Sequence, residues 1–131
     1  MDEPRSLPID GLTVTRIAID DSLTLFCRAG DGRAAEIRID GRFSLRAADG
    51  ATSEGCVEDN PSSAGPALNL ILGLIRAARI DEGGGAVIDF ADGTSLAADA
   101  EEHFVSWEVS TSAGFHAVCL ADRDVVVKDV V

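Results

Sequence analysis

Apolar and polar residues alternate with a period of two along much of the chain, a pattern typical of strands with one buried face. The alternation is clearest in residues 13–19, 23–27, 36–39 and 43–46. Short turns separate these segments, and one of them contains Asp31-Gly32, a dipeptide that tolerates the positive φ angles of tight hairpin turns. The first third of the chain therefore predicts a meander of short antiparallel strands.

One segment breaks this alternation. Residues 67–72 read Ala-Leu-Asn-Leu-Ile-Leu, and Ser62 or Ser63 followed by Pro66 suits the N-terminus of a helix. Because such a helix is apolar on nearly all sides, we expect it near residues 65–73, buried against one face of the sheet. The preceding residues 48–65 are poor in large apolar side chains, so we expect a mobile loop there.

Alternation returns in the last third of the chain, in residues 104–109, 115–120 and 125–128. Altogether the pattern predicts about nine or ten short strands and one helix. We interpret this as an α+β fold that is mostly antiparallel β. A chain of 131 residues has the length of one domain, and we assign residues 1–131 to a single domain.

An internal pseudo-repeat is visible when the sequence is shifted along itself by about 61 residues. Ile19-Asp20 then falls on Ile80-Asp81, and Asp31-Gly32 falls on Asp92-Gly93. We interpret the match as two meander units, roughly residues 11–47 and 73–110. Neither unit can bury a sheet face alone, so the two are expected to share one core.

The composition is that of a folded acidic protein. Hydrophobic residues make up 46% of the chain and charged residues 26%, with 23 acids against 11 bases and a net charge of −12. Residues 1–46 carry net −1 and residues 47–131 net −11, so the acidity is concentrated in the second part. Binding to a nucleic acid backbone relies on Lys and Arg, and this charge excludes it as an expected function.

Three features predict a cytoplasmic location. The N-terminal residues are acidic and lack the basic-then-apolar order of a signal peptide. The longest aliphatic run is much shorter than the ~20 residues that span a bilayer, so we expect no membrane partner. Cys27, Cys56 and Cys119 are an odd number with no close pair, and they imply no disulfide framework.

The cysteines and histidines supply no convincing catalytic or metal-binding motif. His116 and Cys119 are three residues apart in a predicted strand, so they point to opposite faces and cannot easily share an ion. We interpret Cys27 and Cys119 as small core residues. A Cys119 nucleophile with His103 as its base stays an alternative that no local motif supports.

Two other segments resemble ligand sites only superficially. Residues 99–103, Asp-Ala-Glu-Glu-His, hold the densest group of oxygen and nitrogen ligands but lack the order of a calcium loop. Residues 82–85, Glu-Gly-Gly-Gly, lack the Gly-Lys-Ser/Thr ending of a phosphate-binding loop. We therefore expect no catalytic residue, no metal and no cofactor.

The C-terminal third contains a set of short motifs, namely Trp107-Glu108-Val109, Gly114-Phe115, Val118-Cys119-Leu120 and residues 125–127. This set resembles the C-terminal signature of an uncharacterised family of small bacterial β-rich proteins. Members of this family carry two Asp-Gly hairpin units on either side of a helix, and the likeness covers about residues 7–127. Residues 121–124 depart from the Pro-Gly-Gly type of turn common in the family. The resemblance implies a single domain and supplies no catalytic residues.

Three functional hypotheses follow. The first is a non-enzymatic acidic module that binds a basic protein partner, as an immunity or antitoxin-type inhibitor does. The second is a small-ligand binder with an apolar pocket between sheet and helix. The third is an enzyme with Asp or His chemistry, for which we find no motif. For the first hypothesis we expect the binding residues in loops, namely Glu58, Asp59, Asp99, Glu101 and Glu102.

Overall fold

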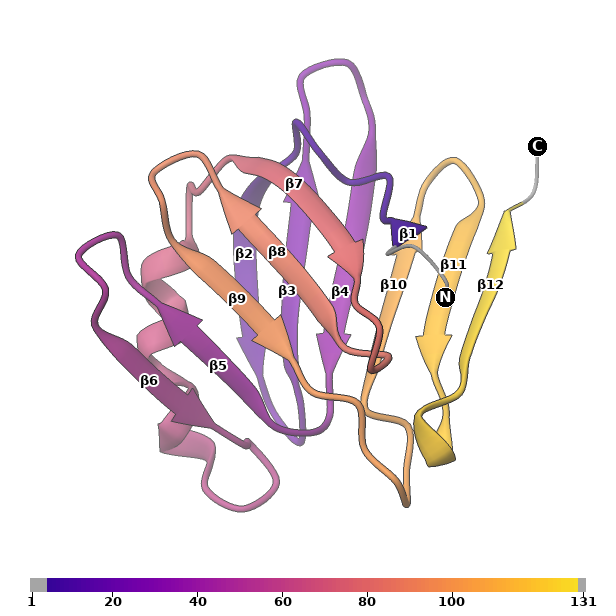
Figure 1. Cartoon of the computed structure of the whole chain (residues 1–131). Helices are drawn as coiled ribbons and strands as arrows, with labels where there is room; N and C mark the ends of the chain where they lie inside the picture. The colour runs from indigo at the N-terminus through magenta and orange to yellow at the C-terminus, as the bar shows by residue number, and fades with distance from the viewer. Residues whose placement is uncertain (1–4, 130–131) are drawn as a thin grey trace.

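A computed structural model describes residues 5–129, which form two antiparallel sheets of six strands packed face to face (Figure 1). Sheet A has the strand order β1–β7–β8–β9–β5–β6, with β1 at Arg5–Ser6, β7 at Ile75–Ile80, β8 at Ala86–Phe90, β9 at Ser95–Ala98, β5 at Phe43–Arg46 and β6 at Thr52–Gly55. Sheet B has the order β12–β11–β10–β4–β3–β2, with β12 at Val125–Asp129, β11 at Phe115–Cys119, β10 at Trp107–Thr111, β4 at Ala34–Ile39, β3 at Leu23–Arg28 and β2 at Thr13–Ile19.

The core lies between the two sheets, where the alternating apolar residues of both inner faces meet. Leu25 and Ile37 are buried on sheet B, and Ile88 and Leu96 are buried on sheet A. Trp107 of β10 is the largest fully buried side chain of the described residues. This pairing of inner faces is the usual way in which two antiparallel sheets bury their apolar sides.

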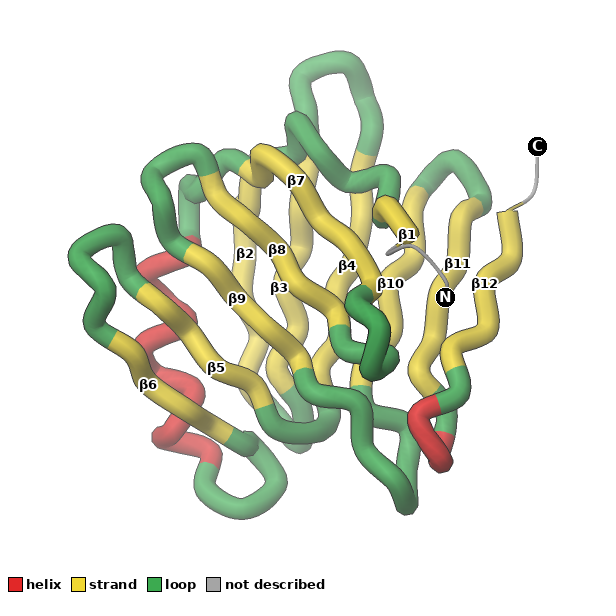
Figure 2. Tube along the Cα trace, viewed as in Figure 1, coloured by secondary structure: helices red, strands yellow, loops and turns green. Residues whose placement is uncertain are grey.

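Within the described residues the chain passes between the sheets three times (Figure 2). Residues 7–12 lead from β1 of sheet A to β2 of sheet B. The two later passages are related: residues 40–42, the first crossing, lead from β4 of sheet B to β5 of sheet A, and residues 99–106, the second crossing, lead from β9 of sheet A to β10 of sheet B. Each crossing strand then pairs with the strand that the other crossing left: β5 pairs with β9, and β10 pairs with β4. The two crossings therefore lie at the same end of the molecule.

The expectation of a mostly antiparallel β fold is confirmed, whereas the α+β assignment is too helical. Strands account for 48% of the structure and helix for only 10%. The described residues form twelve strands rather than nine or ten, because β1 and β6 have no clear period-two pattern in the sequence. No helix of residues 5–129 is long and apolar enough to cross a bilayer.

The expected buried helix near residues 65–73 is the part of the prediction that was wrong. The segment forms a 3₁₀ helix, η1, at Pro61–Leu70, in which Asn60 caps the N-terminus and Pro66 lies inside the helix. Its buried residues are Ala64, Ala67 and Leu70. Their spacing of three matches the three residues per turn of a 3₁₀ helix, so only one narrow side faces the core.

The apolar residues after Ala67 that suggested complete burial are largely exposed. Leu68 and Ile71 are exposed, and Leu72 is 77% exposed. Figure 1 places η1 at the side of the sandwich, between β2 of sheet B and β6 of sheet A, and η1 contacts both of these strands. The helix therefore closes one side of the sandwich and does not cover a sheet face.

Residues 48–65, where we expected a loop, contain a strand and the start of η1. Residues 52–55 form β6, which pairs with β5 through partners such as Ser44 and Glu54. Farther along, the N–H of Cys56 donates to Oγ of Ser63 at 2.9 Å. The small and polar residues of this segment suggested a loop. The strand is nevertheless formed at the edge of sheet A, where it pairs with β5 on one side and contacts η1.

The two Asp-Gly dipeptides lie in hairpin turns with closely similar geometry. Gly32, between β3 and β4, and Gly93, between β8 and β9, both have φ of 94°. The Asp31 carboxylate accepts the N–H of Arg33 at 3.0 Å. The Asp92 carboxylate accepts the N–H of Thr94 at 2.9 Å. Glycine is favoured at both positions because positive φ costs it no steric strain.

Candidate functional site

The strand register brings six connecting segments to one end of the sandwich. In sheet B, Leu23 pairs with Ile39, Ile39 with Trp107, and the β10–β11–β12 ladder continues to the β12 start. In sheet A, Ile80 pairs with Ala86, Ala86 with Ala98, and Ala98 with Phe43. The segments that follow these strand ends are residues 20–22, 40–42, 56–60, 81–85, 99–106 and 120–124, and we call them together the acidic end.

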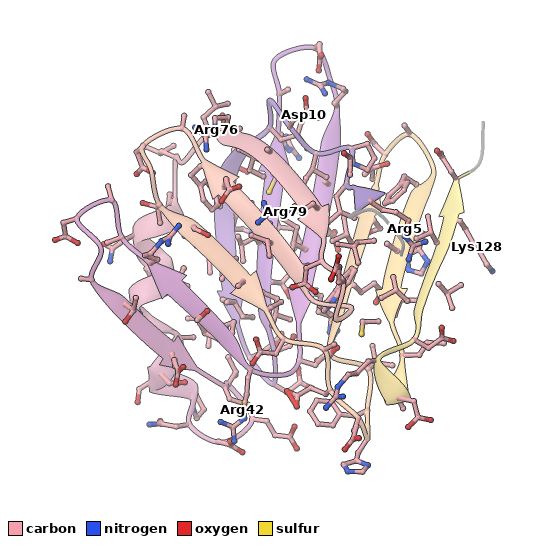
Figure 3. All side chains as sticks on the ribbon, viewed as in Figure 1. Arg5, Asp10, Arg42, Arg76, Arg79 and Lys128 are labelled. Carbon is pink, nitrogen blue, oxygen red and sulfur yellow. The ribbon has the colours of Figure 1, made fainter. Side chains whose placement is uncertain are left out.

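The acidic end carries most of the net charge of the protein. Twelve of the 23 acids and two of the 11 bases lie in its six segments, which gives a net charge of −10 out of −12. The two bases are Arg42 and Arg123. Figure 3 shows Arg42 at this end of the molecule, with Arg76 and Asp10 at the opposite end. The acids that the sequence spreads over a hundred residues therefore converge on one surface.

Hydrogen bonds between the segments hold this end together. The N–H of Asp122 donates to the carbonyl of Glu102 at 2.7 Å, which ties η2 (Ala121–Arg123) to the second crossing. The N–H of Asp99 donates to the carbonyl of Arg42 at 2.9 Å, which ties the two crossings to each other. A further bond from the Asp40 N–H reaches the carbonyl of Ser106 at 2.9 Å. Backbone groups thus fix where the acidic side chains project.

All five residues expected from the sequence belong to the acidic end. Glu58 and Asp59 lie in the segment between β6 and η1, and Asp99, Glu101 and Glu102 lie in the second crossing. A cavity of about 270 Å³ brings Asp59 and Asp99 onto one surface, although they are 40 positions apart in the sequence. Glu58 and Glu102 do not line this cavity and point to solvent as exposed side chains.

Arg42 is the base around which the first group of acids gathers. It lines the 270 Å³ cavity together with Glu54, Asp59 and Asp99, so one positive charge faces three negative ones. Its backbone N–H also donates to Oε2 of Glu101 at 3.4 Å. The same cavity is completed by polar and small groups of residues 55, 56, 60 and 63.

Gly41 explains how Glu101 approaches the first crossing so closely. A Cβ atom at position 41 would lie 2.9 Å from Cγ of Glu101. Since real Cβ atoms do not approach other carbons so closely, only glycine allows the present position of the Glu101 side chain. The Asp-Gly-Arg sequence of the first crossing therefore contributes a close backbone approach as well as a charge.

Asp99 carries the electrostatic signature of this crowding. Burial is the largest cause that raises the pKa of its carboxyl group, and the negative charges of Glu101 and Glu54 raise it further. Arg42 acts in the opposite direction but does not cancel these effects. A raised carboxyl pKa is expected where like charges are held together in partly desolvated surroundings.

Seven other acids of this end were not predicted from the sequence. Three of them lie in residues 1–46, where the net charge is only −1, and four lie in short turns of the second part of the chain. Several of the missed acids have structural partners. The Asp20 carboxylate accepts the N–H of Ser22 at 3.0 Å, Asp40 pairs with Arg38 at 3.2 Å, and Asp81 accepts the N–H groups of Gly83 and Gly85, both at 2.9 Å. The seven are Asp20, Asp21, Asp40, Asp81, Glu82, Asp122 and Asp124.

The residues of the alternative catalytic hypothesis lie in separate environments. Cys119 is completely buried, whereas the side chain of His103 is 88% exposed and lies 3.8 Å from Glu102. His116 contacts Glu108 on the outer face of sheet B, away from the inward-facing Cys119. Burial also raises the pKa of the Cys27 thiol to about 12. Across residues 5–129 no group of three or more His, Cys, Asp or Glu side chains is arranged to hold a metal ion.

Comparison with known proteins assigns the chain to a family. One family model, described as a family of unknown function (DUF6188), matches residues 5–128. The chain belongs to the DUF6188 family. This confirms the resemblance to an uncharacterised family that the C-terminal motifs suggested. No curated protein and no solved structure matches this DUF6188 chain. The function of the DUF6188 chain is therefore unknown.

Proposed function

We propose that the chain is a non-enzymatic interaction module that binds a basic protein partner through its acidic end, in the manner of an immunity or antitoxin-type inhibitor. The observation that carries this proposal is the net charge of −10 on six segments at one end of a chain whose total charge is −12. Nine of the 11 bases lie outside that end. A partner protein with a basic surface would be complementary in charge to the acidic end.

The exposed acids give this surface its unneutralised charge. Glu58, Asp59 and Asp122 are exposed, and within the described residues none of them forms an ion pair with Lys or Arg. Charges of one sign that are concentrated on one surface raise the association rate with an oppositely charged partner and lower it with partners of the same sign. The twelve-stranded scaffold holds the loops in place, as is common for binding loops on rigid sheets.

The alternative of a small apolar ligand receives less support. The cavity beside η1 has a volume of about 270 Å³ and is lined by Arg42, Glu54, Asp59 and Asp99 among others. Apolar ligands favour pockets whose walls are mostly hydrophobic. A charged cavity of this kind suits the side chain of a basic protein better, with an Arg or Lys reaching the three carboxylates.

We also propose that the chain contains two repeated units, roughly residues 11–47 and 73–110. The strand register supports this, because the β2–β3 pair is irregular between Val14 and Arg16 and the β7–β8 pair between Ile75 and Ala77, which are shifted by 61 residues. The order of connections supports it too, since each three-strand meander is followed by a crossing to the other sheet.

A cytoplasmic site of action is part of the same proposal. Cys27, Cys56 and Cys119 are all free, and two of them are buried. Free cysteines are usual where the compartment keeps thiols reduced. An inhibitor that must meet its partner soon after synthesis would work there.

Two variants with equal changes of charge test the proposal. The first replaces four acids of the acidic end by amides: Glu58→Gln, Asp59→Asn, Glu101→Gln and Glu102→Gln. The control replaces the four acids of the turns at the opposite end: Asp10→Asn, Asp31→Asn, Asp49→Asn and Asp92→Asn. Asn keeps an oxygen that can accept the turn hydrogen bonds, so both variants are expected to fold.

The measurement is the association rate constant with the protein that wild-type chain captures from its native cells, at low and high salt. For wild type and the control, we expect the rate to fall steeply as salt screens the charges. The first variant should associate about ten times more slowly at low salt and show a weaker salt dependence. A captured partner with an acidic surface, or equal rates for the two variants, would contradict the proposal.

A further inference from the structure

Sheet B has β2 at one edge and β12 at the other, and the β12 edge is open. Within residues 5–129, β12 pairs only with β11, and no strand lies along its other side (Figure 1). The β2 edge is partly covered instead, because Leu72 donates its N–H to the carbonyl of Val14 at 2.7 Å and Val14 donates to Gly73 at 3.0 Å. In sheet A, η1 contacts β6, and β1 has only two residues. An open strand of five residues with no Pro or bulge is a template for another strand.

The hydrogen-bond pattern shows which backbone groups of β12 are available. The N–H of Leu120 donates to the carbonyl of Asp124 at 2.7 Å, so the backbone N–H and C=O groups of Asp124 point toward β11. Hydrogen-bonded and non-hydrogen-bonded pairs alternate along an antiparallel ladder, so the backbone groups of Val126 and Lys128 also point toward β11. The N–H and C=O groups of Val125, Val127 and Asp129 therefore point outward, toward the open edge.

The charges along this edge are complementary to those of a second copy of the same strand in antiparallel orientation. Residues 123–129 read Arg-Asp-Val-Val-Val-Lys-Asp, a sequence whose charges have opposite signs at equal distances from Val126. Asp124, Val126 and Lys128 share the outer face of sheet B, as their pairing with β11 requires. Within the described residues neither Asp124 nor Lys128 takes part in an ion pair.

From this pattern we propose that β12 is a homodimer interface, in which two copies of this chain pair their β12 strands antiparallel with the two-fold axis at Val126. The outward-facing residues of both copies then meet as Val125 with Val127, which is the hydrogen-bonded pair that the ladder requires. Asp124 lies opposite Lys128 of the second copy, and the axis repeats this pair. Centring the axis on Val125 or Val127 instead puts a charged residue opposite Val126.

The antiparallel arrangement also keeps the acidic ends apart. Asp124 lies at the acidic end, and Lys128 lies near the other end of β12. Because the second β12 strand runs in the opposite direction, the acidic end of the second copy lies beside Lys128 of the first copy. The two ends, each with net −10, then lie on opposite sides of the axis. Like charges are thus separated, and each acidic end stays open to a basic partner.

The test uses sedimentation equilibrium of the full chain and of single charge-reversal variants. Asp124→Lys places Lys opposite Lys128 of the second copy, and Lys128→Glu places Glu opposite Asp124. Because the axis doubles each contact, we expect either variant to raise the dimer dissociation constant about tenfold or more. An equimolar mixture of the two variants restores opposite charges at both contacts and should regain dimers. Arg76→Glu, on β7, makes the same change of charge as Lys128→Glu far from β12 and should leave the dimer unchanged.

A backbone variant tests the edge itself. Val127→Pro removes one outward N–H without removing a bond to β11, as proline is tolerated where the strand edge is free. It should abolish dimers while circular dichroism and the unfolding midpoint of the monomer stay close to wild type. A wild-type chain that stays monomeric up to about 1 mM, or dimers that neither the charge reversals nor Val127→Pro weaken, would overturn the proposal. The four amide substitutions of the acidic end should not affect dimerisation, so this test is independent of the proposed function.

Discussion

The indole N–H of Trp107 donates a 2.9 Å hydrogen bond to the carbonyl oxygen of Gly84, on the opposite sheet. Trp107 is fully buried at the start of β10, and Gly84 lies in the β7–β8 turn, a segment of the acidic end. Gly84 has φ of 90°, and a Cβ there would lie 2.9 Å from the carbonyl oxygen of Arg123. The core thus determines where residues 81–85 approach η2.

We predict that Trp107→Phe destabilises the protein by about 2–4 kcal/mol. The smaller ring leaves a cavity, and the Gly84 carbonyl loses its buried donor. Urea denaturation measures the change in the free energy of unfolding. The exposed Phe104 provides the control, because Phe104→Leu should change stability by no more than about 0.5 kcal/mol. A cost for Trp107→Phe as small as that of the control would mean that the hydrogen bond and the packing of the ring contribute little.

The raised pKa of Asp99 predicts that the wild-type protein gains stability as this group is protonated. The folded-state pKa lies above the unfolded value, so the favourable contribution is present at low pH and is lost as pH rises through the folded pKa. Asp99→Asn removes the charge permanently. We therefore expect this variant to be more stable than wild type at pH 7, by a few tenths of a kcal/mol because the group is partly exposed and screened.

Asp92→Asn is the matched control with the opposite sign. The backbone N–H of Thr94 is the largest cause that lowers the Asp92 pKa, so ionised Asp92 stabilises the fold at pH values above its unfolded pKa. Asp92→Asn should be less stable than wild type at pH 7, and the difference should shrink as pH falls through the Asp92 pKa. Urea denaturation at pH 7 and pH 3 measures both variants. Equal signs for the two variants at pH 7 would contradict this account.

The three cysteines should differ in reactivity, because only one of them is accessible. Cys27 and Cys119 are buried, and burial raises the pKa of Cys27 to about 12, whereas Cys56 is half-buried beside the 270 Å³ cavity. Since the thiolate is the reactive form, we expect iodoacetamide at pH 8 to modify one cysteine rapidly. Mass spectrometry should place the label on Cys56, and Cys56→Ser should take up almost none. Rapid labelling of Cys27 in the folded protein would show that the core opens more easily than its packing indicates.

The strands could be predicted from the sequence because each has one buried face, and burial imposes a period of two. Leu23, Leu25 and Cys27 are buried in β3 and the residues between them are half-buried, as the alternation indicated. The helix could not be predicted correctly, because Leu68 and Leu72 are apolar without being buried. A sequence pattern reports polarity, and it identifies burial only when other elements cover the apolar side chains.

The acidic end could be anticipated only in part. Glu101 and Glu102 stand out in the sequence because acids crowd together there, but Asp20, Asp21 and Asp40 join them only through the pairing of Leu23 with Ile39 and of Ile39 with Trp107. Strand register is a long-range property, and no local pattern contains it. The difference in net charge between residues 1–46 and 47–131 therefore located the charged surface less well than the difference between the two ends of the sandwich.

The backbone at Leu72 leads to a prediction about stored strain. Leu72 has φ of 70°, a left-handed conformation in which an L residue with a bulky side chain is strained, and its side chain is 77% exposed. Its N–H is nevertheless held by the carbonyl of Val14 at 2.7 Å, so the β2 edge imposes this conformation. Leu72→Gly relieves the strain, loses little buried surface, and keeps the hydrogen bond.

We expect Leu72→Gly to stabilise the protein by about 0.5–1 kcal/mol, since the relieved strain exceeds the extra entropy of glycine in the unfolded chain. Leu74→Gly is the matched control, because Leu74 is 46% exposed and has no positive φ. There glycine brings only its entropy cost and the loss of apolar contacts, and stability should fall by about 1 kcal/mol. Thermal and urea unfolding of both variants measure the two changes. If Leu72→Gly lowers stability as much as Leu74→Gly does, the conformation at position 72 is not strained, and the apolar side chain itself contributes to the fold by packing on η1.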